Sequence, residues 1–299
     1  APTVEIGVLS SGTMSTALAP GSPITGSVYW GQNDVEFARY RIRSQDEGFF
    51  IERLNVAGEV GAGTPADVTA NIDQVKLTYT NKAGSTLTAV CTLNSDASVS
   101  FGFSGDNRPY VPKDSSIDIV VKANIKTKSL RTGNALTSTD GTEVNFSLDF
   151  SGGVADEFRA VGEGSGVVID GATNANIANR TGNNQYVYRV YPEFVQETLA
   201  ASEPLGTKDV LKFTIKAHGL ADSKILFDER PSATLKFEVV ASGGTDSNMT
   251  VSLYDVGTGE LLASGGAAAC SSCQSSPLNG RSSVTFDDWE KDVEISGGS

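Results

Sequence analysis

The chain has 299 residues, more than one domain usually holds, so its length favours two domains. Hydrophobic residues make up 39 % of it, which is enough for buried cores and too many for a disordered chain. The formal net charge of -13 would repel nucleic acid and anionic membrane surfaces, so we expect neither as a partner. No apolar run approaches the roughly 20 residues that span a bilayer.

The first residues form an alternating apolar run. Val4, Ile6 and Val8 alternate with polar or small residues, and Leu9 follows. This pattern predicts a strand with one buried face. A start at Ala1-Pro2 is typical of a chain from which a signal peptide has been removed after a small residue. We therefore expect an extracellular or cell-surface protein.

Further runs alternate apolar and polar side chains at period two, as half-buried strands do. Clear examples are Val75–Tyr79, Ile117–Val121, Val144–Leu148, Leu211–Ile215, Leu235–Val239 and Val251–Tyr254. Turn-forming residues separate them at Asn81–Gly84, Asp140–Gly141, Asp170–Gly171 and Gly257–Gly259. Strands and turns at this spacing predict an all-β fold of antiparallel β-sandwiches. The best helix candidate, Val195–Ala201, is short.

A polar stretch over residues 171–184 has few apolar side chains, as linkers between domains do. It predicts a first sandwich domain over residues 13–170 and a second over residues 185–299. Residues 1–12 would form a separate extended strand before the first domain. The second domain is the shorter of the two, which suits a sandwich that lacks a strand.

Two segments share an order of features, and this order predicts a duplicated unit. They are VLSSGTMSTALAPGSP with NDVEFARYRIRS near the N-terminus, and VYRVYPEFVQETLAASEPLGTKDVLKFTIKA further along. In each, a strand is followed by a Leu-Ala loop with proline, an Asp-Val pair and an alternating strand. Both segments resemble repeating Ig-like sandwich modules of bacterial surface-layer and fibre (pilin-like) proteins. The resemblance implies two Ig-like domains in tandem and a structural role at the cell surface.

The sequence offers little for catalysis. Its one histidine, His218, ends a predicted strand, and no G-x-S-x-G turn surrounds a serine, so no serine-hydrolase site is expected. A glycosidase needs two carboxylates across a cleft, whereas neighbours on a strand point to opposite faces. The acidic pairs here are such neighbours, at Asp46–Glu47, Asp156–Glu157 and Asp287–Asp288. We therefore expect that the protein is not an enzyme.

Three cysteines have two expected fates. Cys270 and Cys273 form a C-x-x-C in a loop rich in Gly, Ala and Ser, where a local disulfide is expected in an oxidising compartment. Cys91 lies in an alternating strand, and a buried free thiol is its expected state. No metal or cofactor site is predicted. Calcium at the acidic loop Asp140–Glu143 stays an alternative, without the spacing of an EF-hand.

Surface modification and sugar binding also have candidate residues. Sequons for N-glycosylation occur at Asn145, Asn179 and Asn248 and matter in a host that glycosylates. Two groups of aromatic residues are candidates for a platform that stacks on a sugar ring: Trp30 with Tyr29 and Tyr110, and Trp289 with Tyr186, Tyr188 and Tyr191. Packing in a core is the more frequent fate of such aromatic residues.

These features predict an extracellular structural subunit that assembles with itself into a filament or surface array. A sandwich that lacks a strand exposes an edge, and a strand from a neighbouring subunit can fill it. The run at Val4–Leu9 suits such a donor strand, with Ser10–Gly12 as a hinge. Since the contact is head to tail, it would propagate rather than close. The partners would be other copies of the chain, with glycans or a neighbouring cell surface as further partners.

Two alternatives stay open at this point. The N-terminal run is equally well interpreted as the first strand of its own sandwich. The whole chain is also compatible with a monomeric adhesin or carbohydrate-binding module.

Overall fold

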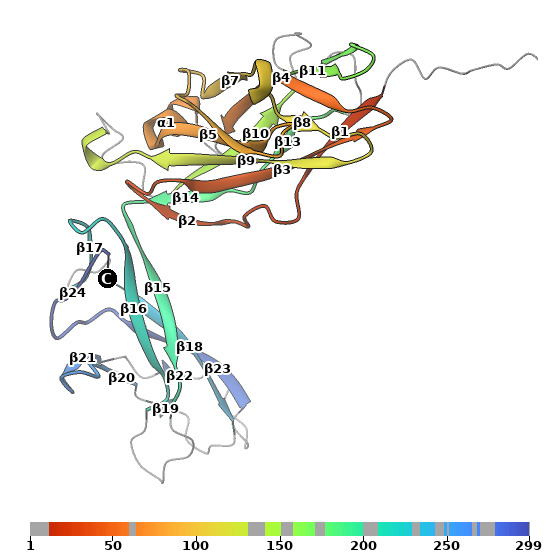
Figure 1. Ribbon diagram of the computed structural model, residues 1–299. Coiled ribbons are helices and arrows are strands. Elements are labelled where there is room, and N and C mark those ends of the chain that lie inside the picture. Colours follow the sequence, from red (N-terminus) through yellow and green to blue (C-terminus); the bar gives the residue numbers. More distant parts are fainter. Residues whose placement is uncertain are drawn as a thin grey trace, which may run out of the picture. The chain divides into compact units, whose positions relative to one another are not determined.

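The computed structural model divides the chain into two compact units, Ala1–Tyr191 and Pro192–Ser299 (Figure 1). The structure describes residues 12–59, 64–130, 141–150, 158–170, 177–199, 209–228, 234–242, 248–249, 251–264, 268–269 and 279–298. Nearly all regular elements in these ranges are strands, and their pairings are almost entirely antiparallel. The predicted all-β fold class is confirmed.

One layer of the first unit is a five-stranded antiparallel sheet. Its strands, from one edge to the other, are β1 (Thr13–Leu18), β3 (Val35–Gln45), β9 (Ser116–Ile125), β5 (Ile72–Thr80) and β6 (Thr86–Cys91). β1 and β6 are therefore the two edges of this sheet. The chain enters the described part of the first unit at β1, directly after Gly12.

The other layer is a larger sheet built around β4 (Phe49–Glu59). Its main path runs β12 (Val168–Asp170), β11 (Phe158–Gly162), β4, β10 (Thr142–Asp149), β14 (Gln185–Tyr188) and β2 (Gly26–Tyr29). Three short strands join it: β13 (Arg180–Thr181) pairs with β10, while β7 (Ser98–Gly102) and β8 (Tyr110–Val111) pair with β4. β2 and β14 run parallel.

The two sheets share one apolar core because their strands alternate buried and outward-facing side chains. On β3, Tyr40 and Ile42 are fully buried while Arg41 and Arg43 are exposed. Phe37 meets Phe146 of β10 edge to face, with ring centres 5.1 Å apart. The Tyr40 hydroxyl donates to the carbonyl of Phe146. These contacts fasten one layer to the other, and the first unit is a β-sandwich.

Helical segments are few in the described residues: α1 (Pro65–Asn71) and the short 3₁₀ turns Gly105–Asn107 and Lys128–Leu130. Pro65 occupies the first turn of α1, where its missing N–H costs nothing. The Asp67 carboxylate accepts hydrogen bonds from the Thr64 N–H at 2.7 Å and the Thr64 hydroxyl at 3.0 Å. The run Thr-Pro-Ala-Asp was therefore a readable helix start.

The described strands of the second unit form separate two-stranded pairs. These are β15 (Val190–Glu197) with β16 (Lys212–Gly219), β17 (Lys224–Phe227) with β24 (Val293–Ser296), β18 (Leu235–Ser242) with β23 (Asn279–Phe286), β19 (Asn248–Met249) with β22 (Ala268–Ala269), and β20 (Ser252–Tyr254) with β21 (Leu261–Ser264). A small core includes Phe227, Phe286 and Trp289. The rings of Phe227 and Trp289 lie 4.8 Å apart.

The boundary between the units lies further along the chain than the sequence predicts. Residues 177–184, expected in a linker, belong to the first unit. Ile177 is buried in its core, β13 pairs with β10, and the Gly182 N–H donates to the Phe146 carbonyl at 2.8 Å. This stretch is polar because its asparagine side chains and backbone groups form hydrogen bonds with the neighbouring sheet. β14 likewise belongs to the first unit, and residues 195–197 are strand rather than helix.

We expect Phe37→Ala to destabilise the first unit by about 3–5 kcal/mol, since it removes a fully buried ring that joins the two sheets. Each unit holds one of the two tryptophans, so a Trp289→Phe background leaves Trp30 as the reporter of the first unit. Urea denaturation followed by Trp30 fluorescence measures the change.

Leu130→Ala is the control for that experiment. Leu130 is half exposed, and its truncation should change the free energy of unfolding by less than about 0.5 kcal/mol. Equal effects of the two substitutions would contradict the shared core between the sheets.

Candidate functional site

The predicted site residues fall into two groups. Val4, Ile6, Val8 and Leu9 of the expected donor strand, with Cys270 and Cys273 of the expected disulfide, lie outside the described residues. The donor strand and the disulfide therefore stay predictions. Cys91 lies within the described part as a half-buried free thiol on β6.

The sequons differ in their surroundings. Asn145 on β10 is buried, and its Nδ2 donates to Oδ1 of Asn184 at 2.7 Å. A glycan on this nitrogen would have to displace Asn184, so the folded structure does not fit glycosylation at Asn145. Asn179 is exposed, although its Nδ2 donates to Asp149 at 2.9 Å. Asn248 lies on β19.

The residues considered for catalysis are dispersed. Nε2 of His218 lies 2.7 Å from the Glu193 carboxylate across the β15–β16 pair, and this hydrogen bond lowers the pKa of Glu193. Asp287 and Asp288 are exposed. In the described part of the chain, no three His, Cys, Asp or Glu side chains gather as they would around a metal ion. No helix there is long and apolar enough to cross a membrane.

The aromatic residues separate into core and surface. Trp30 and Trp289 are 4 % and 2 % exposed, so neither can stack on a sugar ring. Three half-buried tyrosines lie together instead: the Tyr191 ring centre is 6.5 Å from that of Tyr29 and 6.4 Å from that of Tyr188. This tyrosine cluster is the sugar-binding candidate that the structure leaves in place.

The N-terminal segment joins the sandwich at a tightly held glycine. A Cβ atom on Gly12 would lie 2.6 Å from the Gln45 carbonyl oxygen and 2.8 Å from the Glu47 Cβ, so no larger residue fits there without a shift. The Gly12 N–H also donates to the Glu47 carboxylate. Gly12 is therefore a fixed exit point, and not the end of a flexible hinge as the sequence predicted.

Glu47 ties this exit point to a second turn. Its carboxylate accepts hydrogen bonds from the N–H groups of Gly164 at 2.7 Å and Ser165 at 2.5 Å, and from the Ser165 hydroxyl at 2.7 Å. Burial of the carboxyl tends to raise its pKa, but the hydrogen bonds from Ser165, Gly164 and Gly12 outweigh burial. The pKa of Glu47 is held below its ordinary value.

A second carboxylate continues this arrangement at the same end of the sandwich. Glu163 forms an ion pair with Lys82 and accepts a hydrogen bond from the Tyr110 hydroxyl at 2.5 Å. That hydrogen bond is the main reason why the pKa of Tyr110 rises to about 12. We call Gly12, Glu47, Lys82, Tyr110 and Glu163 the exit cluster. Both carboxylates of the exit cluster bind hydrogen-bond donors of the chain itself, so the cluster holds these turns of the chain together.

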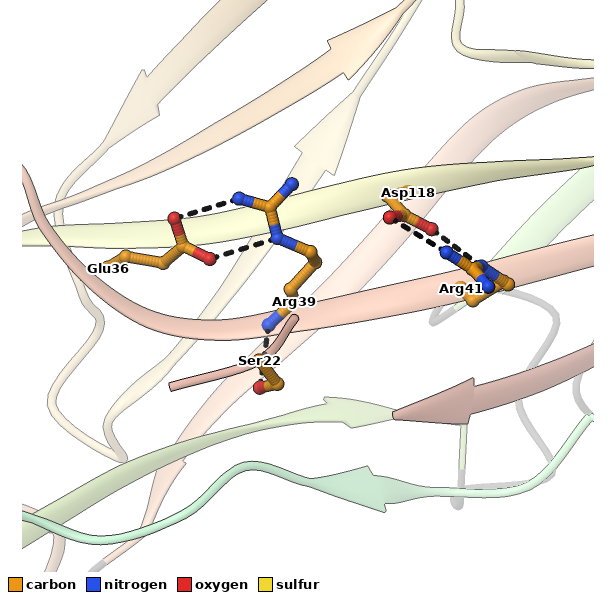
Figure 2. A network of polar contacts seen from close by, with 5 residues as sticks. All are labelled: Ser22, Glu36, Arg39, Arg41 and Asp118. Atoms are coloured by element: carbon orange, nitrogen blue, oxygen red, sulfur yellow. Dashed lines mark hydrogen bonds and ion pairs between the residues drawn. The ribbon is translucent and has the colours of Figure 1, made fainter. Parts of the chain in front are cut away.

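Charged side chains cover the outer face of β3. Arg39 is held by Glu36 through two hydrogen bonds of 3.0 and 3.1 Å, and Arg41 by Asp118 of β9 through two of 2.9 and 3.2 Å. The Arg39 N–H also donates to the Ser22 hydroxyl oxygen at 3.0 Å (Figure 2). These ion pairs face solvent and contribute little to stability. They mark the middle of the five-stranded sheet as a charged surface.

Sequence reasoning found the acidic pair Asp46–Glu47 but missed its role. Two partners of Glu47, Gly164 and Ser165, lie 117 and 118 residues further along the chain, where no local pattern connects them to it. The only local signal was Gly12 itself, a glycine directly before an alternating strand.

Comparison with known proteins adds no assignment. The chain matches no family model, and no curated protein is similar to it. The resemblance to Ig-like modules of surface proteins therefore stays a prediction.

We expect the first unit to lose stability as the pH falls below about 4.3, the ordinary pKa of a glutamate. The folded-state pKa of Glu47 is lowered, so its contribution is present above the unfolded pKa and is lost as the pH falls through the folded one. At pH 7, Glu47→Gln should lower the free energy of unfolding by about 1 kcal/mol. The difference from wild type should shrink towards pH 3. Urea denaturation followed by Trp30 fluorescence measures both.

Asp46→Asn is the matched control, because it neutralises the exposed neighbouring carboxylate. It should leave the pH profile of stability unchanged. A Glu47→Gln variant with the same pH profile as wild type would show that the exit cluster does not depend on this charge.

Proposed function

We propose that this chain is an extracellular structural subunit that assembles head to tail into a filament or surface array. Residues 3–9 would form a strand donated to a neighbouring copy. The protein would act without catalysis, at the cell surface or outside the cell. Its partners would be further copies of itself.

The observation that carries this proposal is the way the chain enters the first unit. Gly12 is locked against Gln45 and Glu47 at the start of β1, an edge strand. The segment before it carries the alternating run Val4, Ile6 and Val8. A strand-forming segment attached to a firmly held point at a sheet edge is suited to pairing with another sheet, because its root loses little further freedom on binding.

The second unit adds independent support. Each of its described strands pairs with one other strand in the part of the chain that the structure describes, and the bridges Ala217↔Gly297 and Ala263↔Trp289 and a small shared core join these pairs. Several apolar side chains there stay exposed, among them Phe194, Tyr254 and Val256 at 48 %, 53 % and 68 %. Exposed apolar side chains favour association with other copies.

The tyrosine cluster favours a second candidate function. Tyr29, Tyr188 and Tyr191 are half buried and lie close together, and partly exposed aromatic faces can stack on sugar rings. A monomeric adhesin or carbohydrate-binding module would use such a surface. The proposed subunit could also present it to a neighbouring cell.

Negative-stain electron microscopy of the purified full chain tests the first proposal. We expect filaments or sheets from the wild type and none from a chain that lacks residues 1–11. Ile6→Lys, on the apolar face of the run, should also abolish assembly, since a charge would enter an apolar groove.

Glu5→Lys is the control, because residue 5 lies on the opposite face of an alternating strand. It should assemble like the wild type. Assembly that survives both the deletion and Ile6→Lys would rule out strand donation. A wild type that stays monomeric would rule out the filament, and binding to a glycan array, with Tyr191→Ala as the comparison, would then test the adhesin.

A further inference from the structure

β6 is an edge strand of the five-stranded sheet. Within the described ranges, β5 is the only strand that pairs with it. The opposite edge of the same sheet is protected: the Thr16 hydroxyl on β1 donates to the Ala178 carbonyl at 3.0 Å, and Arg180 donates to the Thr16 carbonyl at 2.9 Å. The two edges of this sheet therefore differ: β1 forms hydrogen bonds with a second segment of the chain, and β6 pairs with β5 alone among the described strands.

β6 also lacks the sequence features that usually prevent an edge strand from pairing with another chain. No charged residue and no proline occurs from residue 83 to residue 95. The β5–β6 pairing runs from Thr80↔Thr86 to Val75↔Cys91 without a bulge. Natural edge strands are usually interrupted by a lysine, a proline or a bulge, since an unguarded edge pairs with other chains. The charged outer face of β3 and β9 has no counterpart here.

The backbone groups that face away from β5 can be assigned. The Asn81 N–H donates to the Ser85 carbonyl at 3.0 Å at the hairpin end. Hydrogen-bonded and non-hydrogen-bonded pairs alternate from there along an antiparallel ladder. Thr86, Thr88 and Val90 therefore form the non-hydrogen-bonded pairs with β5. Their N–H and C=O groups point to the open side.

An incompletely covered apolar layer lies beside this edge. Leu87, Ala89 and Cys91 pack against the core of the first unit but stay half buried. A hollow of about 540 Å³ adjoins Cys91 at the end of β6. It is lined by Val90, Cys91 and Thr92, by Val99 and Ser100 of β7, and by Gln74 and Asn94. One more strand beside β6 would place alternate side chains over this layer.

We propose that the open edge of β6 accepts residues 3–9 of a second copy of this chain. The inference rests on the proposed strand donation and names its acceptor. Val4, Ile6 and Val8 would cover the half-buried layer, while the backbone pairs with Thr86, Thr88 and Val90. The run carries a single charged side chain, Glu5, on its other face, so an uncharged edge meets an apolar face.

The geometry requires that the donor comes from another copy. A strand beside β6 lies five inter-strand spacings from β1, about 24 Å. Only Ser10, Ser11 and Gly12 connect residue 9 to β1, and three extended residues reach about 10 Å. Since Gly12 is fixed beside Glu47, the segment cannot reach its own β6. Donor and acceptor lie at opposite edges of one sheet, so the contact is head to tail and repeats from copy to copy.

Two substitutions at one position test the acceptor in the full chain. Thr88→Pro removes the N–H that faces the open side and leaves the backbone hydrogen bonds to β5 in place. It also removes the 3.2 Å hydrogen bond between the Thr88 and Thr78 hydroxyls, which Thr88→Val removes as well. Thr88→Val keeps that N–H and changes only the side chain. We expect filaments from wild type and Thr88→Val, and monomers with an unchanged circular dichroism spectrum from Thr88→Pro.

A second measurement needs no change in β6. A peptide of residues 1–11 is added to the full-length Ile6→Lys variant, whose own N-terminal strand is expected not to bind another copy. We expect the amides of Thr88 and Val90 to exchange fast in the free protein and to slow when the peptide binds. Thr88→Pro in the same background should weaken peptide binding by about tenfold or more.

The outcomes separate the acceptor from the proposed function. Filaments from a folded Thr88→Pro chain, or peptide protection of amides in the second unit alone, would overturn β6 as the acceptor and leave strand donation standing. A dimer that survives deletion of residues 1–11 but not Thr88→Pro would show that β6 pairs with β6, which overturns the proposed occupant. A wild type without filaments overturns the filament, while slowed exchange at Thr88 and Val90 would still support the acceptor.

Discussion

The outer edge of a β-sheet carries backbone N–H and C=O groups that need partners, and the five-stranded sheet of this chain meets that need differently at its two ends. At β1, Ala178 and Arg180 from the segment before β14 supply the missing contacts. At β6, no described strand other than β5 pairs with the backbone. Since unpaired edges recruit other chains, this asymmetry gives the sandwich a direction. A protein with one protected edge and one open edge is suited to polar assembly.

The exit cluster connects the start of β1 to other turns of the sandwich. Glu47 holds Gly12 and the Gly164–Ser165 turn together, and Glu163 adds Lys82 and Tyr110. Any pull on the N-terminal segment would therefore act on several turns of the sandwich at once. Charge-assisted hydrogen bonds are the stronger kind, and here they lie where a donated strand would transmit load. The charged face of β3, by contrast, serves solubility more than cohesion.

The described strands of the two units are arranged differently. The first unit closes one core between two sheets, with Phe37, Tyr40 and Phe146 at their junction. In the second, the described strands form pairs, and its aromatic rings follow one another from Phe194 through Phe213 and Phe237 to Phe286. One end of this row is half exposed at Phe194.

The sequence by itself determined the all-β class, because a period of two is a local property of a strand, and runs such as Val75–Tyr79 and Val144–Leu148 became β5 and β10. It also showed that residues 83–95 carry no charge. Only the tertiary structure decided that residues 177–184 complete the first unit, that Glu47 clamps Gly12, and that β1 and β6 are opposite edges of one sheet. The physical reason is that the alternation of side chains specifies which face of a strand is buried. Strands pair through backbone N–H and C=O groups, which are the same in nearly every residue, so a strand's own sequence does not identify its partner.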